Sequence, residues 1–153
     1  MRAIALAVCF IASLASAQPW HAHADDEPVT SIGFAACYAA DRDAPITDAI
    51  TDADHDLFVF LGDNVYADTT DHDTLRARWK QLTDREWFQT LTRESHVLAT
   101  WDDHDFGAND AGNSYPEREF SQQAFLDAFN EPTRSTRRST PGVYDAKTFG
   151  PEG

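Results

Sequence analysis

The chain has 153 residues, which is enough for one domain with its own hydrophobic core. Hydrophobic residues make up 42% of it and aromatic residues 12%, a composition that excludes a disordered acidic tail. The net charge of −14 argues against binding to a nucleic-acid backbone and suits a soluble protein that binds cations.

The first residues, 1–17, have the pattern of an export signal. Arg2 supplies the positive charge, 3–14 form an apolar run, and 15–17 are the small residues of a cleavage site. A membrane anchor needs about 20 apolar residues, and this run is shorter. We therefore expect a periplasmic or secreted protein with no membrane span after the signal is removed.

The mature chain is expected to consist of a polar leader and one domain. The leader covers 18–29 and the domain covers 30–153. Cys9 is removed with the signal, so Cys37 is the only thiol of the mature chain. A single cysteine cannot form an internal disulfide, and it therefore needs another explanation.

Within 30–153, predicted strands alternate with predicted helices. Unbroken apolar runs are typical of strands that are buried on both faces, and apolar residues spaced three and four apart are typical of helices. The alternation predicts an α/β domain with a mainly parallel sheet, in which Asp84 caps a helix. The predicted strands are 30–37, 57–61 and 96–101, and the predicted helices are 43–51, 71–82, 85–92 and 118–129.

Each predicted strand ends at side chains that can bind a metal ion. Cys37 ends the first strand, Asp63 and Tyr66 follow the second, and Asp103 and His104 follow the third. Right-handed crossovers bring the carboxyl ends of parallel strands to one edge of the sheet. We therefore expect these side chains to form a single site.

The residue types at this edge suit metal-assisted hydrolysis. Thiolate and phenolate groups bind iron(III), whereas carboxylates suit calcium, magnesium or manganese. Asp63 has two oxygens and can bridge two ions, and two ions together can clamp a phosphate. His104, if it binds no metal, is placed to protonate a leaving group. For Cys37 the alternative is a small buried hydrophobe.

Two blocks of the sequence, at 62–68 and 100–110, carry a family resemblance. The first reads Gly-Asp-Asn-Val-Tyr-Ala-Asp and the second reads Thr-Trp-Asp-Asp-His-Asp-Phe-Gly-Ala-Asn-Asp. They resemble the two signatures of the PhoD-like alkaline phosphatases, which belong to the calcineurin-like metallophosphoesterases. Residues 34–37 resemble the first metal-binding strand of that family, and the similarity covers most of 30–153.

The resemblance implies a metallophosphatase-type α/β sandwich that binds Fe³⁺ and Ca²⁺ and hydrolyses phosphate mono- or diesters. It assigns Cys37, Asp63 and Tyr66 to the iron, with Asp63 bridging to the second metal. Asp103 takes the second-metal position, and His104 is the general acid. A phosphate ester is then the substrate, and the full-length enzyme is expected to be a monomer.

Other polar residues near these motifs are weaker candidates. Asn64, Asn109 and Asp110 are candidates for contacts with the substrate or for support of the metal ligands. Arg137 and Arg138 suit phosphate binding, but in a Ser/Thr-rich loop we expect them only to solvate the chain.

The family resemblance is partial, which leaves alternatives open. Enzymes of this class complete their site with histidine motifs from later strands, and none precedes Gly153. We therefore expect a fragment that holds the amino-terminal half of the sheet. A non-catalytic secreted calcium-binding domain, or a structural α/β domain with acidic surface loops, would have the same acidic segments.

Overall fold

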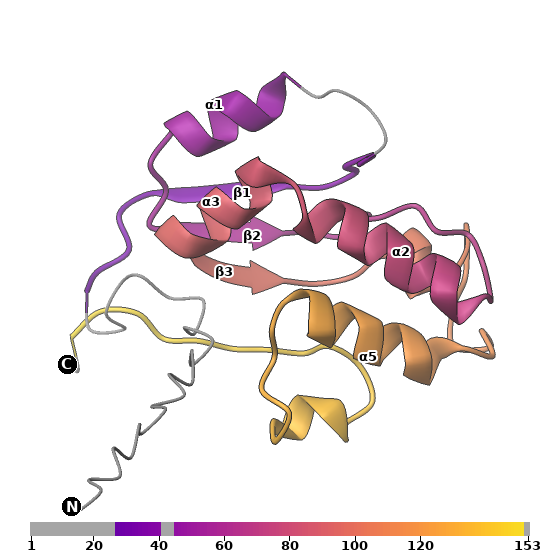
Figure 1. The fold of residues 1–153 in the computed structure, drawn as a ribbon. Coiled ribbons are helices and arrows are strands. Elements are labelled where there is room, and N and C mark those ends of the chain that lie inside the picture. Colours follow the sequence, from indigo (N-terminus) through magenta and orange to yellow (C-terminus); the bar gives the residue numbers. More distant parts are fainter. Residues whose placement is uncertain (1–26, 41–44, 152–153) are drawn as a thin grey trace, which may run out of the picture.

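The computed structural model describes residues 27–40 and 45–151. The predicted export signal and most of the predicted leader lie outside these ranges. Three short strands form one open parallel sheet (Figure 1). The strands are β1 (Ile32–Ala35), β2 (Leu57–Phe60) and β3 (His96–Ala99), in the order β1-β2-β3.

The strand register confirms the predicted parallel arrangement. Ile32 pairs with Leu57, and Leu57 pairs with His96 on its other side. All three strands therefore begin at one edge of the sheet and end at the opposite edge. The segments that follow the three strands therefore lie along one rim of the sheet, as we expected from the sequence.

Helices connect the strands at nearly the predicted positions. Asp71 begins the helix after β2, because its carboxylate accepts a hydrogen bond from the Thr74 amide at 2.8 Å. A single helical turn directly after β3 was not expected. The helices are α1 (Ile46–Asp52), α2 (His72–Thr83), α3 (Glu86–Glu94), α4 (Asp103–Phe106) and α5 (Arg118–Ala128), with a 3₁₀ turn, η1 (Thr136–Arg138).

The prediction that Asp84 caps the following helix is wrong. Arg85 is the residue that precedes α3, and it makes no side-chain cap. Asp84 ends α2 instead, and its carboxylate lies 2.7 Å from Lys80 Nζ, one helical turn earlier. Asp84 keeps helical backbone angles (φ −81°, ψ −9°), whereas Arg85 has the extended conformation of a residue that precedes a helix, so the cap position falls one residue later.

The hydrophobic core lies on one face of the sheet. Phe60 of β2 packs between Phe88 of α3 and Phe129, with ring centroids 5.5 and 5.4 Å apart. On β1, Ile32 and Phe34 are 54% and 67% exposed. The buried cluster consists of Phe58, Phe60, Val65, Leu75, Trp79, Leu82, Phe88, Leu91, Ala124, Phe125, Leu126, Ala128 and Val143.

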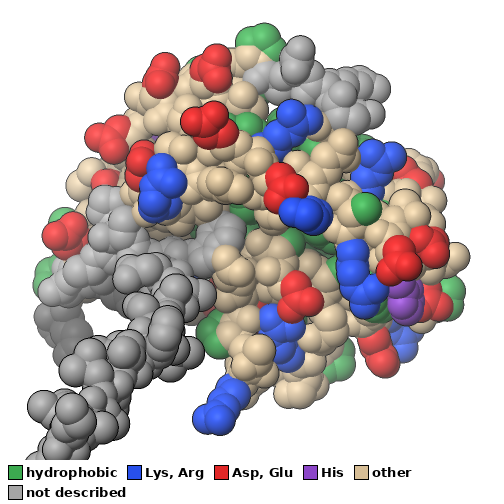
Figure 2. Space-filling model, in the orientation of Figure 1, with side chains coloured by type: hydrophobic (Ala, Val, Ile, Leu, Met, Phe, Trp, Pro, Cys, Tyr) green, Lys and Arg blue, Asp and Glu red, His purple; other side chains and the backbone are tan. Residues whose placement is uncertain are grey.

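The surface carries mixed charge on the face that Figure 2 shows. Acidic and basic side chains are interspersed there, so the excess of acidic residues does not form one continuous patch on that face. Among the described residues, no helix is both long enough and apolar enough to cross a bilayer.

Candidate metal centre

The chain turns sharply after β2 and places Asp63 beside the end of β3. Gly62 has φ +109°, a backbone conformation that L side chains rarely adopt. A Cβ at this position would lie 2.7 Å from the Cβ of Asp102, so only glycine allows the two strand tips to approach so closely. The next residue, Asp63, has φ +50°.

The helical turn α4 presents Asp103 and His104 from the end of β3. A capping box begins this turn. The Asp102 side chain accepts a hydrogen bond from the backbone amide of Asp105, and the Asp105 side chain accepts one from the backbone amide of Asp102. Asp103 Oδ2 accepts a hydrogen bond from the Asp110 amide at 2.5 Å, which lowers the pKa of the Asp103 carboxyl. Asp103 is therefore ionised at neutral pH.

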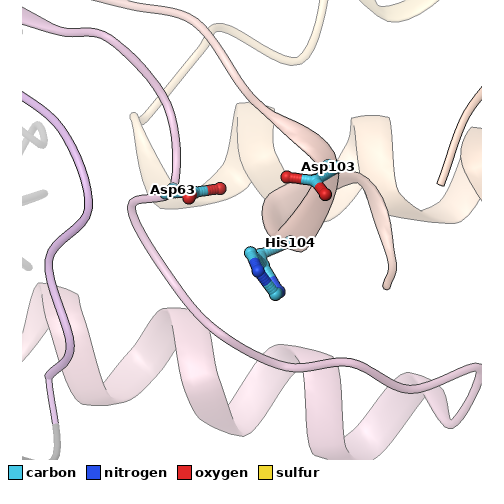
Figure 3. Close-up of side chains that lie close together, drawn as sticks. All are labelled: Asp63, Asp103 and His104. Atoms are coloured by element: carbon cyan, nitrogen blue, oxygen red, sulfur yellow. The ribbon is translucent and has the colours of Figure 1, made fainter. Parts of the chain in front are cut away.

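Asp63, Asp103 and His104 form the group that we call the rim cluster. One ligand atom from each residue lies within 4.8 Å of the others, and each residue is half-buried. Figure 3 shows the two carboxylates turned toward one another, with the His104 ring beside them. This is the one group of at least three His, Cys, Asp or Glu side chains within the described ranges that is arranged to hold a metal ion.

One oxygen of the rim cluster is buried without a hydrogen-bond partner in the described part of the chain. That atom is Asp63 Oδ1. Burial of a carboxylate oxygen without compensation costs free energy, and buried charges in proteins are usually paired or bound to a metal. The unsatisfied oxygen is therefore the feature of this site that points most directly to a cation.

Cys37 and Tyr66 both reach Asp63 at its other oxygen. The Cys37 thiol lies 3.7 Å from Asp63 Oδ2, and the Tyr66 hydroxyl donates to the same oxygen at 3.1 Å. Cys37 is exposed, so the alternative that it is a small buried hydrophobe is wrong. Asp63 is the residue shared by this group and the rim cluster.

The environment of Tyr66 keeps its phenol protonated. Burial, followed by hydrogen bonding to Cys37 and Asp63, raises the pKa of Tyr66. The negative charge of Asp63 acts in the same direction. A cation bound at Asp63 would reverse this electrostatic effect and favour the phenolate.

His104 is held by Asp68, a residue that the sequence interpretation did not assign. His104 Nδ1 lies 2.7 Å from Asp68 Oδ1, and the Asn109 amide donates to the same oxygen at 3.0 Å. Burial disfavours the imidazolium, but the hydrogen bond to Asp68 and the negative charges of Asp68, Asp63 and Asp103 together outweigh it, and the pKa of His104 is raised. Because Nδ1 is engaged, Nε2 is the nitrogen of His104 that can act in the rim cluster.

Backbone strain is concentrated around the same residues. Cys37, Asp63, Asp68 and Asp110 have φ angles of 60°, 50°, 47° and 59°. Such angles are uncommon for residues other than glycine, and strained residues gather at functional sites. The surrounding hydrogen bonds must therefore hold these residues in place.

The three weaker candidates contribute through contacts with the protein. Asn64 is only 2% exposed, and its amide donates to the Thr100 carbonyl and to Asp105. Asn109 and Asp110 are exposed, and their backbone amides donate to Asp68 and Asp103. Of the three, Asp110 donates directly to a member of the rim cluster, whereas Asn64 and Asn109 bind the neighbouring Asp105 and Asp68.

Asp105 is the second residue that the sequence interpretation did not assign. Its carboxylate is completely buried between the tips of β2 and β3. The Asp-x-x-Asp spacing of Asp102 and Asp105 resembles a capping box and was a usable signal for it. For Asp68 the sequence carries no comparable signal, because its partner His104 is 36 residues away.

Arg137 and Arg138 form a separate feature that we call the arginine clamp. Their side chains are only 16% and 17% exposed. Arg137 is paired with Glu131 and donates to the Val143 carbonyl, whereas Arg138 donates to the carbonyls of Glu131 and Pro132. The expectation that these arginines only solvate a loop is therefore wrong, because both stabilise the segment after α5 through hydrogen bonds and ion pairs.

Comparison of the chain with protein-family models, with curated proteins and with solved structures found no match.

Proposed function

We propose that this chain belongs to an exported, metal-dependent phosphoesterase that hydrolyses phosphate mono- or diesters. The observation that carries the proposal is the rim cluster, in which a buried Asp63 oxygen lacks a partner among the described residues. Two aspartates and a histidine gathered at the carboxyl edge of a parallel sheet form a site of the kind that metal-dependent hydrolases use.

The donor set suits the two ions that the family resemblance implies, Fe³⁺ and Ca²⁺. Cys37, Asp63 and Tyr66 would hold the iron, because thiolate and phenolate ligands stabilise a highly charged ion. Asp63 and Asp103 would hold the calcium through carboxylate oxygens. When bound, the two ions would neutralise the phosphate charge and supply hydroxide from water at neutral pH.

His104 would act as the general acid. Asp68 holds Nδ1 at 2.7 Å, so the proton available for transfer is the one on Nε2. Transfer of this proton to the ester oxygen allows the alcohol to leave without a negative charge. The raised pKa of His104 keeps the protonated form populated closer to neutral pH. Asp68 would orient the ring and stabilise its charge.

The sequence blocks at 62–68 and 100–110 support the same proposal. The residues to which their resemblance to the PhoD-like alkaline phosphatases would assign the metal ligands and the acid lie close together in the structure. We extend the proposal to the metallophosphatase-type α/β sandwich, of which the three-stranded parallel sheet would be a part, and to a monomeric full-length enzyme.

Metal analysis together with a hydrolysis assay tests the proposal. Protein purified without chelators is expected to retain iron and calcium. The complete gene product is expected to hydrolyse p-nitrophenyl phosphate or bis(p-nitrophenyl) phosphate. Treatment with a chelator should abolish the hydrolysis, and addition of the two ions should restore it.

The same experiment separates the alternatives. Calcium binding without hydrolysis of either ester would favour a non-catalytic calcium-binding domain. Absence of bound metal, together with absence of hydrolysis, would leave a structural α/β domain with acidic loops. Either result contradicts the phosphoesterase proposal.

A further inference from the structure

Asp105 joins the two strand tips that carry the rim cluster. The side chain has no solvent exposure. Oδ1 accepts a hydrogen bond from the Val65 amide at 2.8 Å, and Oδ2 accepts one from the Asn64 side chain at 2.9 Å. The Asp102 amide donates to Oδ2 at 3.2 Å. A buried carboxylate is thus satisfied by donors from two separate segments.

These donors lie directly beside the residues of the rim cluster. Asn64 and Val65 follow Asp63, and Asp102 precedes Asp103. The Asn64 amide also donates to the Thr100 carbonyl at 3.0 Å, which is a second connection between the two tips. A shift of either tip would break hydrogen bonds to a buried carboxyl group, and that loss is costly.

We propose that Asp105 is a positioning residue that fixes the spacing between Asp63 and the Asp103–His104 turn, and that it thereby sets the affinity of the rim cluster for a cation. Asp105 itself does not reach the cation in this proposal. Partners that hold metal ligands in place typically contribute a factor of about 10 to 100 in metal affinity. The inference rests on the proposed function, because it requires the rim cluster to bind a metal ion.

Asp105→Asn is the direct test. The substitution keeps the size of the side chain, but it replaces one acceptor oxygen with an NH₂ group that must face the N–H donors of the strand tips. We expect the dissociation constant for Ca²⁺, measured by isothermal titration calorimetry on the full chain, to rise about 10- to 100-fold. Amide exchange at Val65 should become faster at the same time.

Leu82→Ala is the matched control for loss of stability. Leu82 is 1% exposed in the core, and truncation of such a residue costs about 2–5 kcal/mol. The substitution touches none of the hydrogen bonds between the strand tips. Below its unfolding temperature, this variant should bind Ca²⁺ as tightly as the unaltered chain. A purely structural role for Asp105 would give both variants the same behaviour.

Asn64→Ala provides a second variant in case Asp105→Asn does not fold. It removes the side-chain connection between the tips and keeps the Val65 amide bond to Asp105, so a smaller loss of Ca²⁺ affinity is expected. The positioning role is overturned if whichever of Asp105→Asn and Asn64→Ala folds has the same dissociation constant for Ca²⁺ as the unaltered chain. The proposed function would then still stand. If the unaltered chain binds no Ca²⁺, both the proposed function and this inference fail.

Discussion

The rim cluster and the arginine clamp both bring together charged side chains, but they balance that charge in different ways. In the clamp, Arg137 is paired with Glu131 and its remaining donors bind backbone carbonyls. In the rim cluster, two carboxylates face each other, and a buried oxygen of Asp63 has no partner within the described ranges.

This difference separates a structural feature from a candidate binding site. A charge network whose members satisfy one another needs no ligand, and it stabilises the fold. Like charges held together by the backbone cost free energy unless something else neutralises them. The clamp should therefore contribute to stability alone, whereas the rim cluster should respond to cations.

Asp63→Asn should have the largest effect of any single substitution at the rim cluster. An amide at this position cannot supply two charged oxygens to two ions, so bound iron should fall and turnover should be abolished in the complete gene product. Elemental analysis and hydrolysis of p-nitrophenyl phosphate measure the two losses.

Asp54→Asn is the matched control for that experiment. Asp54 is exposed and lies outside the rim cluster, and its φ angle of 50° equals that of Asp63. The Asp→Asn substitution therefore meets the same backbone conformation at both positions. This variant should retain metal and turnover. Equal activity of both variants would contradict the assignment of Asp63.

His104→Ala should have the next largest effect, and it should separate catalysis from metal binding. Loss of a general acid typically lowers turnover by about 100- to 10,000-fold, and retained metal is expected because two carboxylates remain. The measurement is turnover together with metal content. Loss of metal along with activity would make His104 a ligand instead of the acid.

Arg137→Ala should affect stability and leave the rim cluster unchanged. The substitution leaves Glu131, whose side chain is only 15% exposed, without its partner. We expect a loss of about 2–3 kcal/mol in the free energy of unfolding, measured by urea denaturation. Arg134→Ala is the control, because Arg134 is exposed and should change stability by less than about 0.5 kcal/mol.

Cation binding should stabilise the folded chain through the rim cluster, independently of the clamp. Ca²⁺ at one hundred times its dissociation constant should add about 2.7 kcal/mol to the free energy of unfolding. The same increment, within about 0.5 kcal/mol, is expected in Arg137→Ala, because the described residues of the clamp and of the rim cluster share no hydrogen bond or ion pair. Asp63→Asn should show no increment. A smaller increment in Arg137→Ala would mean that the two regions are coupled.

The strand-tip positions show what could be predicted from local sequence. Apolar runs identified all three strands, and alternation with helices implied that the strands run parallel. The carboxyl ends of parallel strands must then share an edge, so the gathering of Cys37, Asp63 and Asp103 near one rim followed from chain order alone.

The supporting residues show what could not be predicted in this way. Asp105 lies 41 residues from its partner Asn64, and Asp68 lies 36 residues from His104. In the sequence, Asp68 looks like an ordinary surface acid among the 26 Asp and Glu residues, and the capping-box spacing of Asp105 does not indicate its contact with Asn64. Arg137 and Arg138 likewise look like solvated loop residues in the sequence. Only the structure shows the carbonyl and carboxylate oxygens that accept their hydrogen bonds.

The sequence by itself therefore determined the parallel α/β sheet and the chemical groups at its rim, because side-chain periodicity and chain direction are local properties. Only the tertiary structure decided that an oxygen of Asp63 lacks a hydrogen-bond partner among the described residues, and that Asp105 and Asp68 hold residues from distant segments. The reason is physical: hydrogen bonding and desolvation depend on the groups that surround a side chain, and those groups come from segments that are far apart in the sequence.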